Sequence, residues 1–342
     1  EFRRVLFRSP EEMEACRRNL TELGAHGLVI IGGDDSNTNA AVLAEYFKAN
    51  AVPVSVIGVP KTIDGDMRND YIEASFGFDT ASKVFAEIVG SICRDSMSSR
   101  KYWHFVRLMG RAASHITLEV ALQTRPNLAI ISEEAEAKGW TLKDVVDQIV
   151  TVVKRRAEAG KSYGVVVIPE GLLEFLVDVK AMIAELGIIL GEHEGYLKSL
   201  TSHEDRRQFL TEKLSAESAQ VYNSLPDGIQ EVLLLRDKHG NIPLSQVETE
   251  KLLIDLVSDR IREMKAEGQF QGSFSPLSHF FGYEGRCVQP SNFDADYCYT
   301  LGYTAAQLIR GGVTGYTVSA RNLTAPASEW VMGGVPVTSM LP

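Results

Sequence analysis

The chain has 342 residues, of which 44% are hydrophobic and 23% charged, a composition typical of a globular protein with room for two domains. No stretch of about 20 uninterrupted apolar residues occurs, so we expect no membrane span. Lys and Arg number 35 and Asp and Glu 45, giving a net charge of −10, which argues against nucleic-acid or anionic-membrane partners. A small anionic substrate is still allowed, because it needs only a local basic pocket.

The cysteine and histidine usage gives no sign of a metal or disulfide framework. Four cysteines are spread along the chain without a C-x-x-C pair, and the seven histidines show no metal-ligand spacing. This pattern favours a reducing compartment, here the cytoplasm, over a disulfide-linked fold or a zinc site.

Both ends of the chain differ from what lies between them. Residues 1–9, E-F-R-R-V-L-F-R-S, are basic, but they contain no apolar core of about 7–15 residues and no small-residue cleavage site, so a secretory signal is not supported. We interpret them as a foreign or artefactual segment. The sequence stops at residues 340–342 without a closing helix or polar tail, and we therefore expect a fragment cut at both ends.

Short apolar runs alternate with helical patterns through the first half of the chain. In chain order these patterns predict a helix over 10–23, a strand over 27–31, a helix over 37–49, a strand over 54–59 broken by Pro60, a helix over 76–96, a strand over 104–108, a helix over 112–123, a strand over 128–132, a helix over 141–159 with Thr141 as N-cap, and a strand over 164–168. The alternation has the spacing of βαβ units. It predicts an α/β fold with a mainly parallel sheet and helices on both faces.

The segment 174–272 interrupts this alternation, because it is rich in charge and in helical periodicity and has few strand signals. Its clearest helical stripe lies within 248–265 and is apolar. Strand signals return at residues 280–283. We interpret 174–272 as a mostly helical insertion between two α/β segments.

The segment 32–36, G-G-D-D-S, follows a predicted strand and precedes a predicted helix, the place where open parallel sheets bind ligands. Gly32 and Gly33 would let the backbone approach a phosphate, and the helix start offers free N–H groups. The carboxylates of Asp34 and Asp35 would repel an anion, unless Mg²⁺ bridges them to the phosphate oxygens. Taken alone, the segment is also explained as an ordinary turn with an N-cap.

The segment 60–66, P-K-T-I-D-G-D, also follows a predicted strand. Asp64 and Asp66 are two residues apart and could converge, which would raise the pKa of one carboxyl and suit a general base acting on a hydroxyl. Lys61 would supply a cation for a transferring phosphoryl group and Thr62 a hydrogen-bond donor. A solvated polar turn is the alternative interpretation.

Three further strand ends carry polar or glycine-rich residues: M-G-R at 109–111, P-E-G at 169–171 and F-G-Y-E-G-R at 281–286. Arg111 and Arg286 could clamp a phosphate, and Glu170 could accept hydrogen bonds from sugar hydroxyls. All five segments are expected at the same end of one predicted sheet. Walker, dinucleotide-binding and nucleophile-elbow motifs are missing.

From residue 10 to the C-terminus the sequence resembles the phosphofructokinase family, and within it the diphosphate-dependent branch. The ordered motifs that carry the resemblance are G-G-D-D-S at 32–36, P-K-T-I-D-G-D at 60–66, K-Y at 101–102, M-G-R at 109–111, P-E-G at 169–171 and G-Y-E-G-R at 282–286. The long helical insertion is similar to that of the long-chain clade, which includes the plant-type catalytic subunit.

The resemblance implies two Rossmann-like parallel-sheet domains with a mostly helical insertion. A diphosphate-binding domain would comprise 10–78 and about 287–342, and a fructose 6-phosphate-binding domain 79–173 and about 273–286, with the insertion at 174–272. The implied reaction is reversible phosphoryl transfer from diphosphate to the 1-hydroxyl of fructose 6-phosphate, giving fructose 1,6-bisphosphate and phosphate.

The resemblance also assigns roles to individual residues. Asp34 is similar to the magnesium ligand, Asp64 to the base that deprotonates the sugar hydroxyl, and Arg111 to the arginine that stabilises the transferring group. Catalytic roles extend to Lys61, Thr62, Asp66 and Asp35, diphosphate binding to Gly33, Asp35 and Lys61, and sugar-phosphate binding to Thr62, Ile63, Asp64, Lys101, Tyr102, Met109, Gly110, Arg111, Glu170, Tyr283, Glu284, Gly285 and Arg286.

Two residues select the donor in this comparison. Relatives that use ATP typically have glycine where Asp35 and Lys61 stand; a carboxylate at Asp35 would occupy the space of the nucleotide α-phosphate, and Lys61 would contact diphosphate. An ATP-dependent phosphofructokinase, a non-catalytic regulatory subunit and a sugar-phosphate binding module are the alternatives. The presence of Asp64, Asp66 and Arg111 argues against the last two.

The family also implies an oligomer, because Lys101 and Tyr102 resemble residues that a neighbouring subunit lends to the sugar pocket. The partner would be a second copy or a related regulatory subunit. Family members begin with a strand and a glycine-rich loop that contacts the donor, and these would precede residue 10. We therefore expect the chain taken alone to fold poorly or to lack turnover, an expectation that robust activity would contradict.

Overall fold

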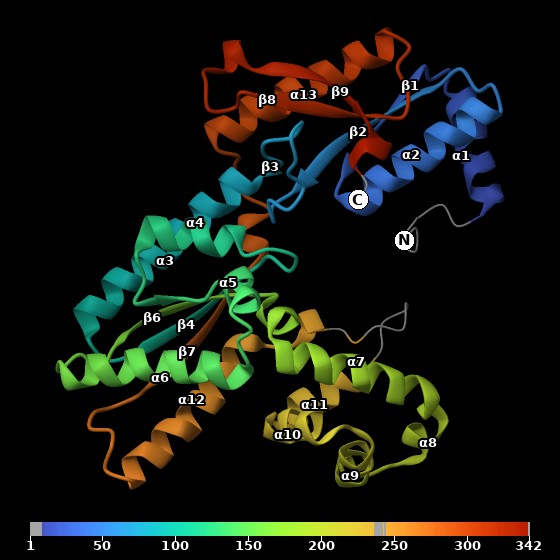
Figure 1. Ribbon diagram of the computed structural model, residues 1–342. Helices are drawn as coiled ribbons and strands as arrows, with labels where there is room; N and C mark the ends of the chain where they lie inside the picture. Colours follow the sequence, from blue (N-terminus) through green and yellow to red (C-terminus); the bar gives the residue numbers. More distant parts are fainter. Residues whose placement is uncertain (1–8, 236–241, 243, 341–342) are drawn as a thin grey trace. The chain divides into compact units, whose positions relative to one another are not determined.

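The computed structural model describes residues 9–340 except 236–241 and 243. The chain divides into two compact units, one formed by residues up to 81 together with those from 286, the other by residues 82–285. Each unit contains its own sheet (Figure 1). None of the helices in the described parts of the chain is both long and apolar enough to cross a membrane.

The first unit is built on a sheet with the strand order β1-β2-β8-β9, in which β3 also pairs with β2. Strand β1 pairs with β2, and β2 with β8, in parallel, whereas β9 runs antiparallel to β8. The elements are α1 (Pro10–Glu22), β1 (Gly27–Gly32), α2 (Asp34–Ala49), β2 (Ser55–Thr62), β3 (Phe76–Gly77), α13 (Asn292–Arg310), β8 (Tyr316–Arg321) and β9 (Val331–Pro336), with short 3₁₀ turns at Ala327–Glu329 and Val337–Met340.

Alternation along β2 explains why helices cover both faces of this sheet. Val56 packs with Leu43 and Phe47 of α2, and α1 adds to this cluster. Ile57 points the other way and joins Tyr297 of α13. Figure 1 shows α1 and α2 on one side of the strands and α13 on the other. The predicted mainly parallel α/β arrangement is therefore confirmed.

Two boundaries predicted in this unit were wrong. Helix α2 begins at Asp34 and not at residue 37, because the Asn37 side chain donates to the Gly32 and Gly33 carbonyls at 2.8 and 3.0 Å and closes the first turn. Strand β2 continues through Pro60. The proline lies between Gly58, the last residue paired with β8, and the pairing with β3 that begins at Lys61, and it is the last residue of β2 in register with β1. Its missing N–H therefore lies at the end of the β1 ladder and outside the other two.

The second unit contains an all-parallel sheet with the order β5-β6-β4-β7. Its elements are α3 (Phe78–Ser99, whose first turn belongs to the first unit), β4 (Trp103–Leu108), α4 (His115–Thr124), β5 (Leu128–Ala129), α5 (Ser132–Ala137), α6 (Leu142–Glu158), β6 (Gly164–Pro169), η1 (Leu172–Phe175), α7 (Val177–Glu192), α8 (Glu194–Ser199), α9 (His203–Lys213), α10 (Ala216–Ser224), α11 (Asp227–Leu233), η2 (Leu244–Gln246), α12 (Thr249–Ala266), β7 (Pro276–Phe281) and η3 (Tyr283–Gly285).

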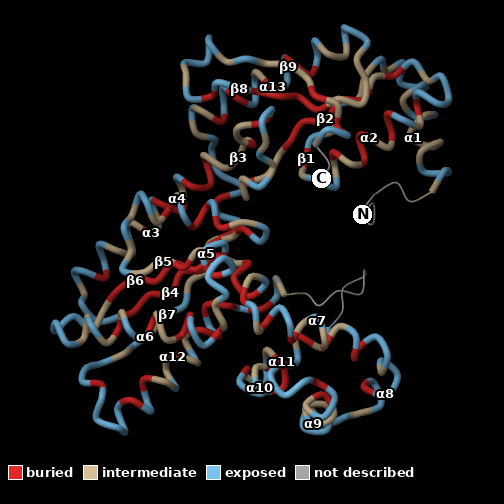
Figure 2. Tube along the Cα trace, in the orientation of Figure 1, coloured by how far each residue is buried: buried red, intermediate tan, exposed pale blue. Residues whose placement is uncertain are grey.

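The core of this unit lies between the sheet and helices α6, α7 and α12. Every residue of β4 and β6 is buried (Figure 2). Trp103 and Phe105 of β4 belong to the apolar cluster that these helices cover. Figure 1 shows α3 and α4 on the opposite face. Burial on both faces explains why β6 is a continuous apolar run and why β4 is apolar except for His104 and Arg107.

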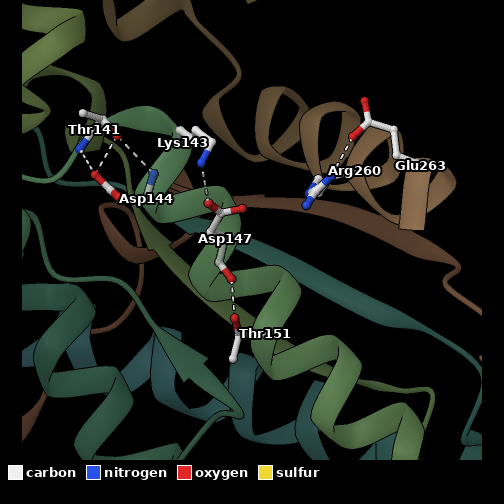
Figure 3. A network of polar contacts seen from close by, with 7 residues as sticks. All are labelled: Thr141, Lys143, Asp144, Asp147, Thr151, Arg260 and Glu263. Carbon is white, nitrogen blue, oxygen red and sulfur yellow. Dashed lines mark hydrogen bonds and ion pairs between the residues drawn. The ribbon is translucent and has the colours of Figure 1, made fainter. Parts of the chain in front are cut away.

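Helix α6 begins where the sequence predicts. The Thr141 hydroxyl accepts from the Asp144 N–H at 3.2 Å, and the Asp144 carboxylate accepts from the Thr141 N–H at 2.8 Å, forming a capping box (Figure 3). Lys143 and Asp147 form an exposed ion pair one turn on. Between β6 and β7 the described residues form helices and 3₁₀ turns, from η1 and α7 to α12, as the sequence pattern predicts.

Three other predicted boundaries shift in this unit. One of them begins in the first unit, where strand β3 occupies residues 76–77, so α3 starts at Phe78. The helix predicted from 112 starts at His115, and the strand predicted over 128–132 is only two residues long. Ser114 and the following α5 cap one another, since the Ser132 N–H donates to Ser114 Oγ at 2.9 Å and the Ser114 N–H donates to Glu133 at 2.8 Å. The Ser132 N–H bond to Ser114 uses a backbone donor that a longer strand β5 would need for pairing.

A histidine pair on β4 and β7 predicts a pH dependence of stability. His104 Nδ1 and His279 Nε2 lie 2.9 Å apart. Burial lowers the pKa of both rings. The pKa of His104 is lowered further by the charge of His279, and the negative charge of Asp95 raises it by a smaller amount. The unfolded chain therefore binds more protons, and the stabilising contribution of the neutral pair is lost as the pH falls below about 6.5.

We expect the free energy of unfolding to decrease between pH 7.5 and pH 5.5, with a slope of at most about 1.4 kcal/mol per pH unit for each histidine. Urea unfolding measured at several pH values would test this. His279→Phe should flatten the slope, whereas the same change at the exposed His115 should leave it unaltered. Equal slopes for all three proteins would contradict the assignment.

Candidate active site

The carboxyl ends of β1 and β2 bring the first two predicted segments together. Gly32 is paired with Pro60 in the parallel register, so the residues that follow each strand are neighbours. A Cβ atom built on Gly33 would lie 3.7 Å from the Lys61 carbonyl oxygen. The structure therefore places the Gly33 backbone beside Lys61, and Asp34 and Asp35 follow Gly33 at the start of α2.

Asp34 and Asp35 occupy the first turn of α2, where the helix dipole favours negative charge. Although Asp34 remains accessible to solvent, surrounding protein raises its pKa, and the negative charges of Asp66 and Asp35 raise it further. Three carboxylates thus face one another closely enough to interact. This mutual repulsion would be relieved by a divalent cation.

The donor set fits Mg²⁺ held mainly by substrate. In the described residues no three His, Cys, Asp or Glu side chains form a ready-made metal site. Mg²⁺ commonly takes only one or two carboxylates from a protein and its other ligands from water and phosphate oxygens. Asp34, with Asp66 nearby, meets that requirement.

The loop after β2 is fixed by short-range hydrogen bonds. The Asp64 N–H donates to Thr62 Oγ1 at 3.1 Å, and Ser75 Oγ donates to the Thr62 carbonyl at 2.8 Å. Gly65 has a φ of +72°, a left-handed conformation that favours glycine. Ile63 is buried and Asp64 is half-buried. Asp64 and Asp66 therefore lie on a structured turn at the same strand end as Lys61.

The buried carboxylate of Asp294, more than 200 residues further along the chain, holds the backbone next to this turn. Asp294 of α13 accepts from the Gly77 N–H at 3.0 Å and from the Thr80 N–H at 2.9 Å. Gly77 is the residue of β3 that pairs with Thr62. Asp294 thus fixes both the start of α3 and the strand beside the candidate site.

In the second unit, three predicted segments meet at the carboxyl end of β4. Leu108 is paired with Pro169 of β6 and with Phe281 of β7. The Met109 N–H donates to the Phe281 carbonyl at 2.9 Å, and the Gly110 N–H donates to Glu170 Oε2 at 3.0 Å. The loops that contain Met109, Glu170 and Gly282 are therefore joined directly.

Arg111 lies among acidic side chains on this rim. The pKa of Glu174 is raised, mainly by burial. The positive charge of Arg111 lowers this pKa and the negative charge of Glu170 raises it, so the three charged side chains interact. Sequence reasoning missed Glu174. The available signal was its position four residues after Glu170. The 3₁₀ turn η1 follows β6 and turns the chain, so that Glu174 comes back toward this rim.

The loop after β7 carries the remaining candidates. Glu284 Oε2 accepts from the Gly282 N–H at 2.9 Å and so shapes its own loop. Tyr283 is largely exposed, with 68% of its surface accessible. Gly285 is buried against the Phe85 ring, where a Cβ atom would lie 2.5 Å from the ring. Arg286 follows at the start of the second stretch of the first unit.

Lys101 and Tyr102 lie elsewhere. They immediately precede β4, whereas Met109 follows it, and a six-residue strand separates its ends by about 20 Å. Both residues are exposed. Within one chain they do not reach the rim that contains Met109, which leaves them available to another subunit.

The five polar strand ends were predicted to share one sheet, and this prediction was wrong. Segments 32–36 and 60–66 belong to the sheet of the first unit, and segments 109–111, 169–171 and 281–286 follow strands of the second. Equal spacing of strands and helices along the sequence does not reveal where one sheet ends and the next begins. The candidates therefore form two groups of neighbouring residues, one in each unit.

Glycines at the second rim predict a stability effect. A Cβ atom on Gly171 would lie 2.0 Å from the Arg111 carbonyl oxygen, and backbone there cannot move aside cheaply. We expect Gly171→Ala to lower the free energy of unfolding by about 2 kcal/mol or more. Gly187→Ala in α7, where no atom lies within 4 Å of the added methyl group, should instead stabilise by about 0.5–1 kcal/mol. Urea unfolding of both variants would check this, and equal effects would contradict it.

Comparisons with known proteins point to one family. A family model described as "Phosphofructokinase" matches residues 2–309. The chain is 54% identical over 333 residues to the pyrophosphate–fructose 6-phosphate 1-phosphotransferase of Porphyromonas gingivalis, covering 97% of this chain and 60% of that protein. It is 49% identical over 334 residues to the protein of that name, subunit beta, from Ricinus communis, covering 97% of this chain and 59% of the relative. The chain thus spans about 60% of the length of these curated relatives.

Solved structures agree on the fold. The crystal structure of a pyrophosphate-dependent phosphofructokinase from Marinobacter aquaeolei matches 98% of this chain and 64% of that chain with a TM-score of 0.59 and 16% sequence identity. The phosphofructokinase from Saccharomyces cerevisiae matches 98% of this chain and 35% of that chain with the same TM-score and identity. The two-sheet α/β fold with its helical insertion is thus a phosphofructokinase fold.

Proposed function

Because the chain belongs to the phosphofructokinase family, we propose that it transfers a phosphoryl group reversibly from diphosphate to the 1-hydroxyl of fructose 6-phosphate. The products are fructose 1,6-bisphosphate and phosphate. The chain's similar relatives from Porphyromonas gingivalis and Ricinus communis carry names that state this donor and this acceptor.

The observation that carries the proposal is the position of Asp35 and Lys61 at neighbouring strand ends. Asp35 presents a carboxylate where a nucleotide would need room for a further phosphate, and Lys61 presents a cation to the small inorganic donor. Repulsion on one side and attraction on the other discriminate between donors. An ATP-dependent enzyme would gain nothing from Asp35 here.

The chemistry needs a base and charge neutralisation more than covalent catalysis. The sugar 1-oxygen attacks the phosphorus, the bridging P–O bond breaks, and the leaving group departs as phosphate. Asp64 accepts the hydroxyl proton as the new bond forms. Lys61 and Arg111 stabilise the negative charge on the transferring group, while Thr62 and Asp66 line the transfer site.

A divalent ion completes the donor site in this proposal. When bound, Mg²⁺ would neutralise part of the diphosphate charge, and Asp34 with Asp66 nearby would hold it. Gly33 lets the backbone approach the diphosphate. The chain's own contribution is to gather these carboxylates on one strand end and to fix the turn that bears Asp64.

The rim of the second unit would bind the sugar phosphate. Glu170 uses one oxygen for the Gly110 N–H, and its other oxygen can accept from a sugar hydroxyl. Arg111 and Arg286 would contact phosphate as bidentate donors. The other residues of this rim proposed for the sugar phosphate are Met109, Gly110, Tyr283, Glu284 and Gly285. Thr62, Ile63 and Asp64 of the first unit are proposed as contacts of the same ligand, with Lys101 and Tyr102 from a neighbouring subunit.

We further propose that residues 10–78 and about 287–342 serve the donor, that 79–173 and about 273–286 serve the sugar phosphate, and that 174–272 is an insertion. The neighbouring subunit would be a second copy or a related regulatory chain. Relatives named as beta and alpha subunits occur in Arabidopsis thaliana, at 48% and 40% identity to this chain.

Binding and turnover measured side by side would test the proposal. Calorimetric titration should detect fructose 6-phosphate, and detect diphosphate with Mg²⁺ present. Any fructose 1,6-bisphosphate that a coupled assay detects should form from diphosphate, with at least about 100-fold lower kcat/KM for ATP, a preference of about 2.7 kcal/mol. Preferred use of ATP would favour the ATP-dependent alternative, and binding without turnover in the subunit assembly would favour a regulatory chain.

A further inference from the structure

An ion pair is buried in the core of the second unit, at the end of β4 that precedes the sugar-phosphate rim. Arg107 Nε lies 2.6 Å from Glu250 Oε2, and the two side chains expose only 7% and 3% of their surface. Glu250 belongs to the first turn of α12, 143 residues further along the chain. Neither residue is used in the proposed chemistry.

The guanidinium makes two further contacts, which together hold it in one orientation. Arg107 Nη1 donates to the Val247 carbonyl at 3.3 Å, and its central carbon lies 4.1 Å above the centre of the Phe280 ring. Phe280 is the residue of β7 paired with Arg107 in the parallel register. A planar cation that pairs, donates and stacks at once is a role to which arginine is suited and lysine is not.

The stack continues to the rim. A Cβ atom on Gly282 would lie 2.7 Å from Phe280 Cζ and 2.8 Å from Met109 Cε, so the ring, the Gly282 backbone and the Met109 side chain are packed together. The Met109 N–H in turn donates to the Phe281 carbonyl at 2.9 Å. Contacts therefore run without a break from α12 through Arg107 and Phe280 to both rim loops.

Stability alone does not account for such a pair. Burying two charges removes their hydration, and well-packed apolar residues of similar volume are often as stable or more so. An apolar pair could not, however, both reach the Val247 carbonyl and hold the Phe280 ring from one side. The pair therefore specifies a position more than it adds stability.

We infer that Arg107 is a positioning residue, through which Glu250 and the first turn of α12 set the loops at Met109–Gly110 and Gly282 for sugar-phosphate binding. The helical insertion would thereby control the affinity for the acceptor. The ligand named here rests on the proposed function; the positioning of the loops does not.

Two readings of the double variant Arg107→Met with Glu250→Leu test the inference. Hydrogen exchange should be about tenfold or more faster at the Met109 and Gly110 amides than in the unsubstituted chain, with β6 amides and the thermal midpoint little changed. The dissociation constant for fructose 6-phosphate should rise about tenfold, while that for diphosphate with Mg²⁺ stays within twofold. Arg107→Lys, which keeps the charge but not the stacking fork, should give intermediate values.

The exposed ion pair of Lys180 and Glu136, 3.1 Å apart in the same unit, provides the control: Lys180→Met with Glu136→Leu should alter neither reading. Unchanged exchange at Met109 and Gly110 in a folded double variant would overturn the inference. If the double variant does not fold, Phe280→Leu, which keeps the ion pair but removes the ring, must give the same faster exchange. If the unsubstituted chain does not bind fructose 6-phosphate, the proposed function fails, and the exchange reading still decides the positioning role.

Discussion

Replacing Asp64 by Asn should reduce turnover with diphosphate by about 1,000-fold while leaving the affinity for fructose 6-phosphate within a few-fold. The amide keeps the shape of the side chain but cannot accept the hydroxyl proton, and a positioned base typically contributes 10²–10⁴-fold. The turn itself should survive, because it is fixed by the Asp64 N–H bond to Thr62 Oγ1 and not by the carboxylate alone. Steady-state kinetics would separate kcat from KM.

Asp70→Asn is the matched control, since Asp70 is exposed in the same loop and undergoes the same change in charge. It should leave kcat within twofold. Where the rate of the chain is too low to measure, the same pair of changes can be placed at the equivalent positions of the Porphyromonas gingivalis relative. A kcat for Asp64→Asn that matches the control would exclude Asp64 as the base.

The second large effect concerns the donor. Asp35→Gly with Lys61→Gly should reduce kcat/KM for diphosphate by about 100-fold or more and make ATP a measurable donor. Loss of the Lys61 charge weakens the grip on the small anion, and loss of the Asp35 carboxylate opens space and removes repulsion for a longer polyphosphate. Asp35→Gly alone should raise the rate with ATP, and Lys61→Gly alone should mainly lower the rate with diphosphate.

Glu45→Gly with Lys48→Gly makes the same two kinds of substitution on exposed positions of α2, away from the strand ends. Its donor preference should be unchanged, although the glycines will destabilise the helix. A ratio of diphosphate to ATP rates that is the same in the site variant and in the unsubstituted chain would refute the steric and electrostatic explanation of donor choice.

Local patterns predicted most of the fold. The capping box at Thr141, the apolar runs of β4 and β6 and the stripe of α12 are each encoded within about 20 residues, and each appears where expected. Helix and strand starts shifted where a side chain bonds to backbone groups at the end of an element, which the hydrophobic pattern does not show. Asn37 closing the first turn of α2 and Ser114 capping α5 are examples.

Long-range features could not be predicted in the same way. Asp294 caps α3 across 214 residues, and Glu250 meets Arg107 across 143. Neither partner is marked by its neighbours in the sequence. The division into two sheets is of the same kind, because strand order depends on which strands pair and not on how they are spaced.

Most candidate residues were found because they follow a strand, and parallel strands bring their carboxyl ends to one edge of a sheet; Lys101 and Tyr102 came from the family resemblance instead. That argument correctly joined Gly33 to Lys61 and Met109 to Glu170. It missed Glu174, which approaches Arg111 only because a 3₁₀ turn follows β6. The strand predicted over 104–108 already placed Lys101 and Met109 at opposite ends, and β4 has them there.

The central claim is that diphosphate, and not a nucleotide, gives its phosphoryl group to the sugar. Phosphorus NMR of one sample that contains the chain, Mg²⁺, fructose 6-phosphate, diphosphate and ATP measures this directly. In any turnover that the chain supports, we predict that the diphosphate signal decreases while phosphate and the C1 phosphate of fructose 1,6-bisphosphate grow one to one, with ATP constant. Formation of ADP in step with fructose 1,6-bisphosphate, with diphosphate unchanged, would contradict the account.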